Sequence, residues 1–215
     1  DGVFNMVQGF GDAGAAITDD SRIDTVLFTG SAEVGHEIAS KVGGEPGKLA
    51  ACEMGGKNGI VVTEKADLDV AVHSAVMSSF KTTGQRCVSS ERLIVHEEVY
   101  DEFKERFVEV AADVAVGDPL DESTFMGPLI EDAHREKVTK YNELAKTEGV
   151  NVLVDRTELG ADEIPDGHAE GHWVGPFVYE ADIDEDLRCT HEEVFGPHVA
   201  LLKYSGDIED AVEYH

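Results

Sequence analysis

Short apolar runs that alternate with longer amphipathic stretches are the feature that most limits how this chain can fold. The runs are VFNMV (3–7), TVLF (25–28), KLAACEM (48–54), GIVV (59–62), RLIVH (92–96), FVYE (177–180) and VALLKY (199–204). Apolar runs of this length, bounded by glycine or polar turns, are typical of buried strands. Strands that alternate with helices along a chain are typical of the α/β class. The sequence therefore predicts an α/β protein.

The stretches between the runs carry helical signals. SAEVGHEIASKV (31–42) has Ser31 in the N-cap position and Glu33 in the first turn, both favourable at a helix start. A second helix is predicted over 66–80, where one face carries Leu68, Ala71, Val72, Ala75, Val76, Ser79 and Phe80. A third is predicted over about 98–114, with Tyr100, Phe103, Phe107, Val110 and Val114 on one face. A fourth covers about 130–148.

One acidic, glycine-rich segment interrupts this alternation at 155–172. Because two further runs follow it, we expect a surface excursion within the same domain rather than a linker. His168 and His172 lie four residues apart among carboxylates, which could suggest a metal site. A solvated loop is the favoured interpretation, and the sequence predicts no metal site.

Composition excludes several classes of partner. The chain has 45 acidic and 17 basic side chains, a formal net charge of -28, which would repel nucleic acid and anionic membranes. The acidic residues are spread over the whole chain, which favours adaptation to high salt over general acidity, since about 1 M salt screens charges beyond about 3 Å. Three dispersed cysteines match neither a disulfide framework nor a zinc motif, and no apolar run of about 18 residues exists. We expect a reducing, cytoplasmic setting without a membrane partner.

Two residues are candidates for chemistry from their surroundings alone. Cys87, in GQRC (84–87), follows a flexible glycine between a helix and a strand, where its thiol would be presented in a cleft. A free thiol has a pKa of about 8.5 and needs a base or a positive environment to react. No histidine lies within eight residues of it, so either a distant partner or a structural role stays open. Glu53 ends an apolar run beside two glycines; burial there would suit it to general-base work, and a salt-bridging turn is the alternative.

Several motifs in register narrow these alternatives. FTGSAEVG (28–35), EMGGK (53–57), GQRC and EEVFGP (192–197) stand in this order, with 23 residues from Gly30 to Glu53 and 34 from Glu53 to Cys87. GDPL (117–120) and MGPL (126–129) lie between the last two. In these segments the chain resembles the aldehyde dehydrogenase superfamily, whose members carry E-[LM]-G-G-K, then G-Q-x-C, then E-E-[VI]-F-G-P. The resemblance covers essentially the whole chain.

The resemblance implies a role for each matching residue. Cys87 would be the nucleophile, its backbone N–H one oxyanion donor, and Glu53 the base that activates the hydrolytic water. Glu193 would hold the nicotinamide ribose, and Phe195 would pack beside the ring. Cys52 stands where the family usually has Leu, and we interpret it as a small core residue and Cys189 as structural. The expected reaction is oxidation of a small aldehyde to a carboxylic acid with NAD or NADP, NAD being favoured.

A glycine motif, GFGDAG (9–14), also has the G-x-G-x-x-G spacing of dinucleotide-binding turns. That fingerprint needs an acidic residue about 20 positions on, at the end of the next strand. TVLF instead leads into Gly30 and Ser31, and helix N-termini attract phosphate. We therefore expect Gly30, Ser31 and Gly35 to face the pyrophosphate, as the resemblance implies. Gly11 and Gly14 would form a close-packed turn beside the adenine pocket.

The resemblance also implies a domain plan. Residues 1–52 would be the end of a Rossmann-like cofactor domain, and 53–215 most of an α/β catalytic domain, with Cys87 between the two. The chain starts at Asp1 rather than Met and stops at VEYH inside an apparent helix, so we expect an internal piece, inactive alone, of a homodimeric or homotetrameric protein. The missing residues would include a second oxyanion donor and a ribose-binding lysine. Two alternatives are a catalytically silent structural or binding member and a cofactor-independent thiol esterase.

Overall fold

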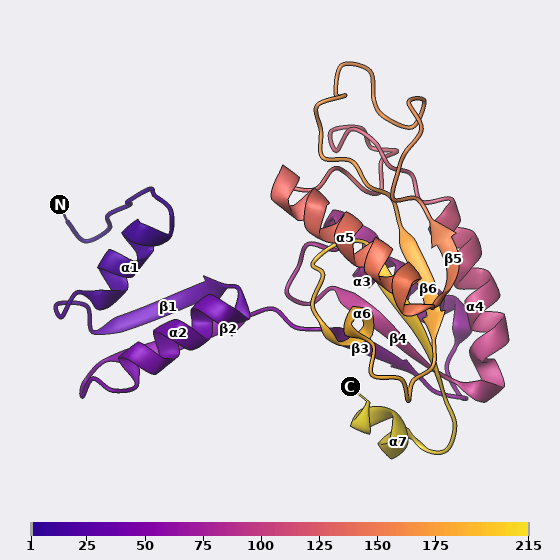
Figure 1. Cartoon of the computed structure of the whole chain (residues 1–215), viewed down its shortest axis with the longest axis horizontal. Coiled ribbons are helices and arrows are strands. Elements are labelled where there is room, and N and C mark those ends of the chain that lie inside the picture. The colour runs from indigo at the N-terminus through magenta and orange to yellow at the C-terminus, as the bar shows by residue number, and fades with distance from the viewer. Residues whose placement is uncertain (1, 215) are drawn as a thin grey trace. The chain divides into compact units, whose positions relative to one another are not determined.

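The chain divides into two compact units in a computed structural model that describes residues 2–214 (Figure 1). The first unit ends at Gly55 and the second begins at Gly56. The predicted domain boundary, between residues 52 and 53, lies three residues before this division. Strand β2 (Leu49–Met54) continues through Glu53, which pairs with Thr29 of the neighbouring strand, so this pairing keeps Glu53 in the first unit.

The first unit is a small parallel α/β layer. Its elements are α1 (Gly11–Asp19), β1 (Thr25–Gly30), α2 (Ala32–Val42) and β2. β1 and β2 pair in parallel, and α2 covers them through a core of Val26, Ile38 and Val42. These two strands and α2 confirm the predicted ones.

Two expectations for the first unit were wrong. VFNMV forms no strand: residues 3–7 lie outside any helix or strand, and Phe4 is 87% exposed. A strand needs a hydrogen-bonded partner, and in the described part of this unit the only paired strands are β1 and β2. GFGDAG is not a close-packed turn, because its last four residues open helix α1. A Cβ on Gly11 or on Gly14 would meet nothing within 4 Å.

The second unit is built on a five-stranded sheet in the order β3-β4-β7-β6-β5. Its strands are β3 (Asn58–Val62), β4 (Ser90–His96), β5 (Asn151–Asp155), β6 (Phe177–Ala181) and β7 (His198–Tyr204). β3, β4, β7 and β6 run parallel, and β5 is antiparallel at the edge. The sequence predicted all of these strands except β5.

Helices cover both faces of this sheet (Figure 1). They are α3 (Leu68–Phe80), α4 (Glu97–Ala112), α5 (Asp132–Glu148), α6 (Arg188–His191) and α7 (Ile208–Glu213), with a 3₁₀ turn η1 (Lys81–Gly84) after α3. Neighbouring strand residues alternate between the faces, as in β4, where Leu93 and Val95 pack with α3 and α4. Ile94 packs instead with residues of α5, α6 and α7. This two-sided burial explains why β4 and β7 read as continuous apolar runs.

The helical faces follow the predicted periodicity with one exception. Val72, Ala75 and Phe80 of α3 are buried as expected. In α4 the buried face continues from Phe107 to Ala111, and Val110 is 43% exposed. Val110 lies three residues after Phe107, at the edge of the apolar face, while Ala111 completes the four-residue step.

The acidic excursion is irregular, as predicted. Residues 156–176 contain no helix or strand, apart from an isolated bridge between Leu129 and His172. Within residues 2–214, no helix is both long and apolar enough to cross a membrane. The predicted helix at the VEYH end is α7, while Asp1 and His215 lie outside the described residues.

Candidate active site

Three motif segments of the second unit enter the same edge of the sheet. Gly56 and Lys57 precede β3, the turn with Cys87 precedes β4, and the loop Glu193–Phe195 leads into β7. β3, β4 and β7 are adjacent and parallel, so their amino ends lie at one edge. Segments up to 137 residues apart in sequence are thereby joined, as in the hydrogen bond from the Gly56 N–H to Glu193 Oε1 at 3.0 Å.

Cys87 lies at the corner of a tight turn between η1 and β4. The turn closes with a hydrogen bond from the Ser89 N–H to the Arg86 carbonyl at 2.9 Å. Arg86 ties the turn to the end of α3 by donating to the Met77 carbonyl at 3.0 Å. The Asn58 amide donates to the Cys87 carbonyl at 2.7 Å, which fixes the turn against β3.

This turn presents the thiol to solvent. Cys87 is exposed, an accessibility that the predicted nucleophile would need. Its N–H makes no hydrogen bond within residues 2–214, so this donor is available to a developing oxyanion. By contrast, burial raises the pKa of the Cys189 thiol to about 12, which keeps that side chain protonated and inert.

Gly84 of GQRC is in contact with the EEVFGP segment. It has a φ of 70°, and a Cβ there would collide with the Gly196 carbonyl. Two further bonds connect GQRC and the residue before it to the MGPL segment and the residue after it. Thr83 Oγ1 donates to the Gly127 carbonyl at 2.9 Å, and Gln85 accepts from the Ile130 N–H at 3.0 Å. Three of the motifs that carry the resemblance therefore form one packed group of loops.

The loop that carries Glu193 and Phe195 is held in an uncommon conformation. Phe195 has a φ of 62°, a left-handed value that non-glycine residues rarely adopt. Both side chains are half-buried, and the Phe195 ring lies 6.3 Å from the His134 ring. Their positions bring the predicted ribose-binding and ring-packing residues together in the second unit with Cys87.

Glu91 is a site-neighbouring residue that the sequence analysis missed. Its carboxylate accepts from the Val194 N–H at 2.9 Å, from the Phe195 N–H at 2.7 Å and from Lys57 Nζ at 2.7 Å. The side chains of this ion pair are only 3% and 5% exposed. Burial lowers the pKa of Lys57, and the Glu91 charge opposes that shift. The sequence held one signal of this role: the carboxylate of Glu91 directly precedes RLIVH, an apolar run predicted to be a buried strand.

In the first unit, the predicted phosphate-binding turn begins helix α2. Ser31 Oγ caps the helix by accepting from the Val34 N–H at 3.4 Å. Gly35 is buried, and a Cβ there would collide with the Met54 side chain, so glycine allows α2 to pack closely on β2. A Cβ at Gly30 would lie 2.5 Å from the Phe28 ring.

Glu53 follows on β2, at the end of the pairing with β1. It is exposed, so the premise that burial adapts it to general-base work does not hold in this structure. The reason is that alternate residues of β2 face opposite sides, and Cys52 and Ala50 are the ones that pack against the core of this unit. Cys52 is half-buried, and its thiol lies 3.6 Å from the Gly35 carbonyl.

Each unit, taken by itself, offers groups that fit part of a dinucleotide. The first turn of α2 offers the N–H groups of Ala32 and Glu33, which have no hydrogen-bond partner in the described chain and suit a phosphate. In the second unit, Glu193 Oε1 is used by Gly56, while no bond to its Oε2 is present among residues 2–214. A carboxylate with a free oxygen suits ribose hydroxyls.

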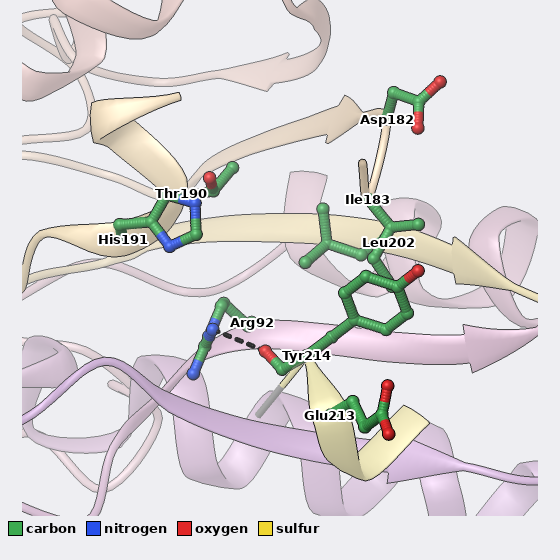
Figure 2. Close-up of a pocket in the computed structure, with 8 residues that line it drawn as sticks. All are labelled: Arg92, Asp182, Ile183, Thr190, His191, Leu202, Glu213 and Tyr214. Carbon is green, nitrogen blue, oxygen red and sulfur yellow. Dashed lines mark hydrogen bonds between the residues drawn. The ribbon is translucent and has the colours of Figure 1, made fainter. Parts of the chain in front are cut away.

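A separate cavity of about 300 Å³ lies between β4, β7 and the chain end (Figure 2). Arg92 lines it and donates to the Tyr214 carbonyl at 2.8 Å. The remaining lining residues are Asp182, Ile183, Thr190, His191, Leu202 and Glu213. None of the predicted site residues lines this cavity. Across residues 2–214, no three His, Cys, Asp or Glu side chains form a metal-binding group, and His168 and His172 each approach a single aspartate.

Comparison with known proteins identifies the fold. A betaine aldehyde dehydrogenase from Brucella anthropi is 38% identical over 209 residues, which cover 97% of this chain and 42% of that protein. The crystal structure of an NAD-dependent aldehyde dehydrogenase from Sinorhizobium meliloti matches with a TM-score of 0.89 and 34% identity over 100% of this chain and 41% of its own. A betaine aldehyde dehydrogenase point mutant from Staphylococcus aureus in complex with NAD+ matches with a TM-score of 0.83 and 28% identity, covering 94% of this chain and 40% of its own.

The chain therefore spans less than half the length of these relatives. Its α/β architecture is that of the matching part of aldehyde dehydrogenase structures. A profile described as "Aldehyde dehydrogenase family" matches residues 1–215. The chain belongs to the aldehyde dehydrogenase family.

Proposed function

We propose that the full-length protein containing this chain oxidises a small aldehyde to a carboxylic acid with NAD or NADP. The observation that carries the proposal is the gathering of exposed Cys87 and the Glu193–Phe195 loop at the amino ends of β4 and β7. The proposed nucleophile and the proposed cofactor-binding loop therefore share one edge of the sheet.

In this proposal the Cys87 thiolate adds to the aldehyde carbon and forms a thiohemiacetal. The Cys87 N–H donates to the oxyanion, which stabilises the charge that develops on it. Nicotinamide, when bound, would supply the acceptor for the hydride that leaves the former aldehyde carbon. As that hydrogen leaves, the oxyanion collapses to a carbonyl, and Cys87 is left as a thioester. Glu53 then takes a proton from a water as the water oxygen adds to the thioester carbonyl. The carbon–sulfur bond breaks, which releases the carboxylic acid and restores the Cys87 thiolate.

Glu193 and Phe195 bind and orient rather than react. The Glu193 carboxylate accepts from ribose hydroxyls, and the Phe195 ring packs beside the nicotinamide. In the first unit, the start of α2, with Gly30, Ser31 and Gly35, would bind the pyrophosphate. Residues 1–55 thus contribute to the cofactor domain and residues 56–215 to the catalytic domain.

NAD is the favoured cofactor, because the matched Staphylococcus aureus structure contains NAD+. Betaine aldehyde belongs in the first set of substrates tested, because the Brucella relative is named for it. We also propose that the full-length protein is a cytoplasmic homodimer or homotetramer.

The decisive experiment supplies full-length protein with a panel of aldehydes and with NAD or NADP. Formation of reduced nicotinamide is followed by its near-ultraviolet absorbance. Cys87→Ala should abolish both aldehyde oxidation and ester hydrolysis, because the same thiol performs both. Cys52→Ala, the same change at a half-buried cysteine of the first unit, should retain activity.

The outcomes separate the three candidate functions. No reduced nicotinamide with any aldehyde would overturn the dehydrogenase proposal and favour a silent member of the family. Ester hydrolysis that continues in Cys87→Ala would exclude Cys87 as the nucleophile. Ester hydrolysis alone, without any cofactor-dependent reaction, would favour a thiol esterase.

Glu53→Gln tests the assignment of the base. Because the amide cannot take a proton from water, thioester hydrolysis should slow more than acylation. We expect a burst of reduced nicotinamide followed by a slow steady state, seen by rapid mixing. Glu37→Gln, another exposed carboxylate of the first unit, should behave like the unaltered protein. An unchanged steady-state rate in Glu53→Gln would show that another group is the base.

A further inference from the structure

Glu91 is the most completely engaged buried carboxylate next to the candidate site. Oε2 receives Lys57 Nζ at 2.7 Å and the Val194 N–H at 2.9 Å. Oε1 receives the Phe195 N–H at 2.7 Å. A buried charge is tolerated only when such partners are present. Glu91 itself faces the backbone of the Glu193–Phe195 loop, not a substrate.

The two backbone donors form an anion-binding concavity. Successive N–H groups converge on one anion where a residue adopts the left-handed conformation, and Phe195 has a φ of 62°. Free anions commonly occupy such concavities. Here the chain's own Glu91 fills this position, so the carboxylate compensates for a conformation that a phenylalanine does not adopt readily.

Lys57, the ion-pair partner of Glu91, is also held in place. Lys57 is held through its backbone, because Arg92 donates to the Lys57 carbonyl at 2.5 Å. The preceding residue, Gly56, donates to Glu193 Oε1. The loop is therefore linked to the start of β3 at two points, through Gly56 and through the Lys57–Glu91 pair.

We propose that Glu91 is a positioning residue that fixes the Glu193 carboxylate and the Phe195 ring for the nicotinamide end of the cofactor. The inference rests on the proposed function, because it gives that loop its cofactor-binding role. Without the Glu91 charge, the Val194 and Phe195 N–H groups lose the carboxylate that accepts their hydrogen bonds, and the buried Lys57 ammonium loses its counter-ion. The loop then relaxes, and cofactor affinity falls while the Cys87 turn stays in place.

The test uses the full-length protein with Glu91→Gln, which keeps the size of the side chain and removes its charge. Titration with reduced nicotinamide cofactor should give a dissociation constant raised by on the order of tenfold. The KM for the cofactor should rise more than kcat falls. Cofactor-independent ester hydrolysis by Cys87 should stay within about twofold, because the Asn58 and Arg86 bonds that hold its turn are untouched.

A second readout needs no cofactor. Amide hydrogen exchange at Val194 and Phe195 should be slow in the unaltered protein and faster in Glu91→Gln, since their N–H groups have lost the carboxylate. If Glu91→Gln does not fold, Glu91→Asp serves instead, because it keeps the charge but draws it away from the loop. We expect Glu91→Asp to raise the cofactor dissociation constant and to speed exchange at Val194 and Phe195, both by less than Glu91→Gln does.

Glu180→Gln is the matched control. Glu180 also forms a half-buried ion pair, with Lys104 at 2.8 Å, but it lies at the carboxyl end of β6. Glu180→Gln should lower thermal stability without changing cofactor affinity or amide hydrogen exchange at Val194 and Phe195. Equal losses of affinity in Glu180→Gln and Glu91→Gln would show a general effect of instability and overturn the inference. An unchanged dissociation constant in Glu91→Gln would also overturn it.

Failure of the proposed function has a different signature. In that case the unaltered protein itself binds no nicotinamide cofactor, whatever residue stands at 91. Exchange at Val194 and Phe195 would still report whether Glu91 holds the loop. Slow exchange retained in Glu91→Gln would then overturn the positioning role independently.

Discussion

The two segments proposed to hold the cofactor are stabilised in opposite ways. The Gly30–Gly35 turn of the first unit depends on neighbours in sequence: Ser31 caps Val34, and its carbonyl accepts from the Gly35 N–H at 3.0 Å. The Glu193–Phe195 loop of the second unit depends on Glu91, 103 residues from Val194, and on Gly56, 137 residues from Glu193.

This difference determines how each segment responds to change. A locally capped helix start loses one bond when its cap is removed, and the rest of the helix remains. A loop held by distant elements moves when any of those elements moves, because its conformation is unfavourable by itself. We therefore expect substitutions around the loop to have larger and longer-ranged effects than substitutions in the turn.

Gly84→Ala should give the largest effect. The new Cβ would collide with the Gly196 carbonyl, and alanine is strained at a φ of 70°. The combined cost is on the order of 3 kcal/mol of unfolding free energy, since backbone strain alone costs about 1–3 kcal/mol. Displacement of Gly196 should also disturb Phe195 and weaken cofactor binding. Thermal unfolding and cofactor titration of the full-length protein measure the two effects.

Gly149→Ala separates strain from collision. Gly149 ends α5 with a φ of 87°, but a Cβ there meets nothing within 4 Å. Gly149→Ala should lower the unfolding free energy by only about 1 kcal/mol and leave cofactor binding unchanged. If Gly84→Ala were no worse than Gly149→Ala, the contact between the GQRC and EEVFGP segments would not be a constraint on the loop.

Ser31→Ala tests the local segment. Loss of the N-cap should lower the unfolding free energy by about 1 kcal/mol, as removal of such caps usually does. Cofactor affinity should fall only modestly, because the N–H groups of Ala32 and Glu33 remain. Ser31→Asn, which can still cap, should restore most of the stability. A loss of affinity in Ser31→Ala as large as in Glu91→Gln would contradict the contrast between the two segments.

The same contrast explains what the sequence could predict. β1 and the capped start of α2 were predicted correctly, because an apolar run and an N-cap serine are local signals. VFNMV has an equally apolar sequence but no strand partner among the described residues, and no local signal reports a missing partner. Glu91 was missed for a related reason: its function depends on Lys57 and Phe195, which only the sheet order brings to it.

The smallest effect is expected at Glu192, the half-exposed neighbour of Glu193. Hydrogen bonds from Arg188 and Tyr141 lower the pKa of Glu192 to about 2, so its bonds stabilise the folded state above the ordinary glutamate pKa of 4.5. That contribution is lost as the pH falls from about 4.5 towards 2. Its size is at most about 0.5 kcal/mol, since Glu192 and Arg188 are 41% and 60% exposed and solvent screens the pair.

Glu192→Gln should therefore lower thermal stability slightly at neutral pH, and its melting curve should meet that of the unaltered protein near pH 2. Added salt should shrink the difference at neutral pH, because the pair is exposed. Cofactor affinity should not change, since Glu192 leaves the Val194 and Phe195 N–H groups with Glu91. If Glu192→Gln weakened cofactor binding as strongly as Glu91→Gln, the solvent-accessible contacts of Glu192 would position the loop as well. The buried Glu91 carboxylate would then not be the group that distinguishes the loop from the turn.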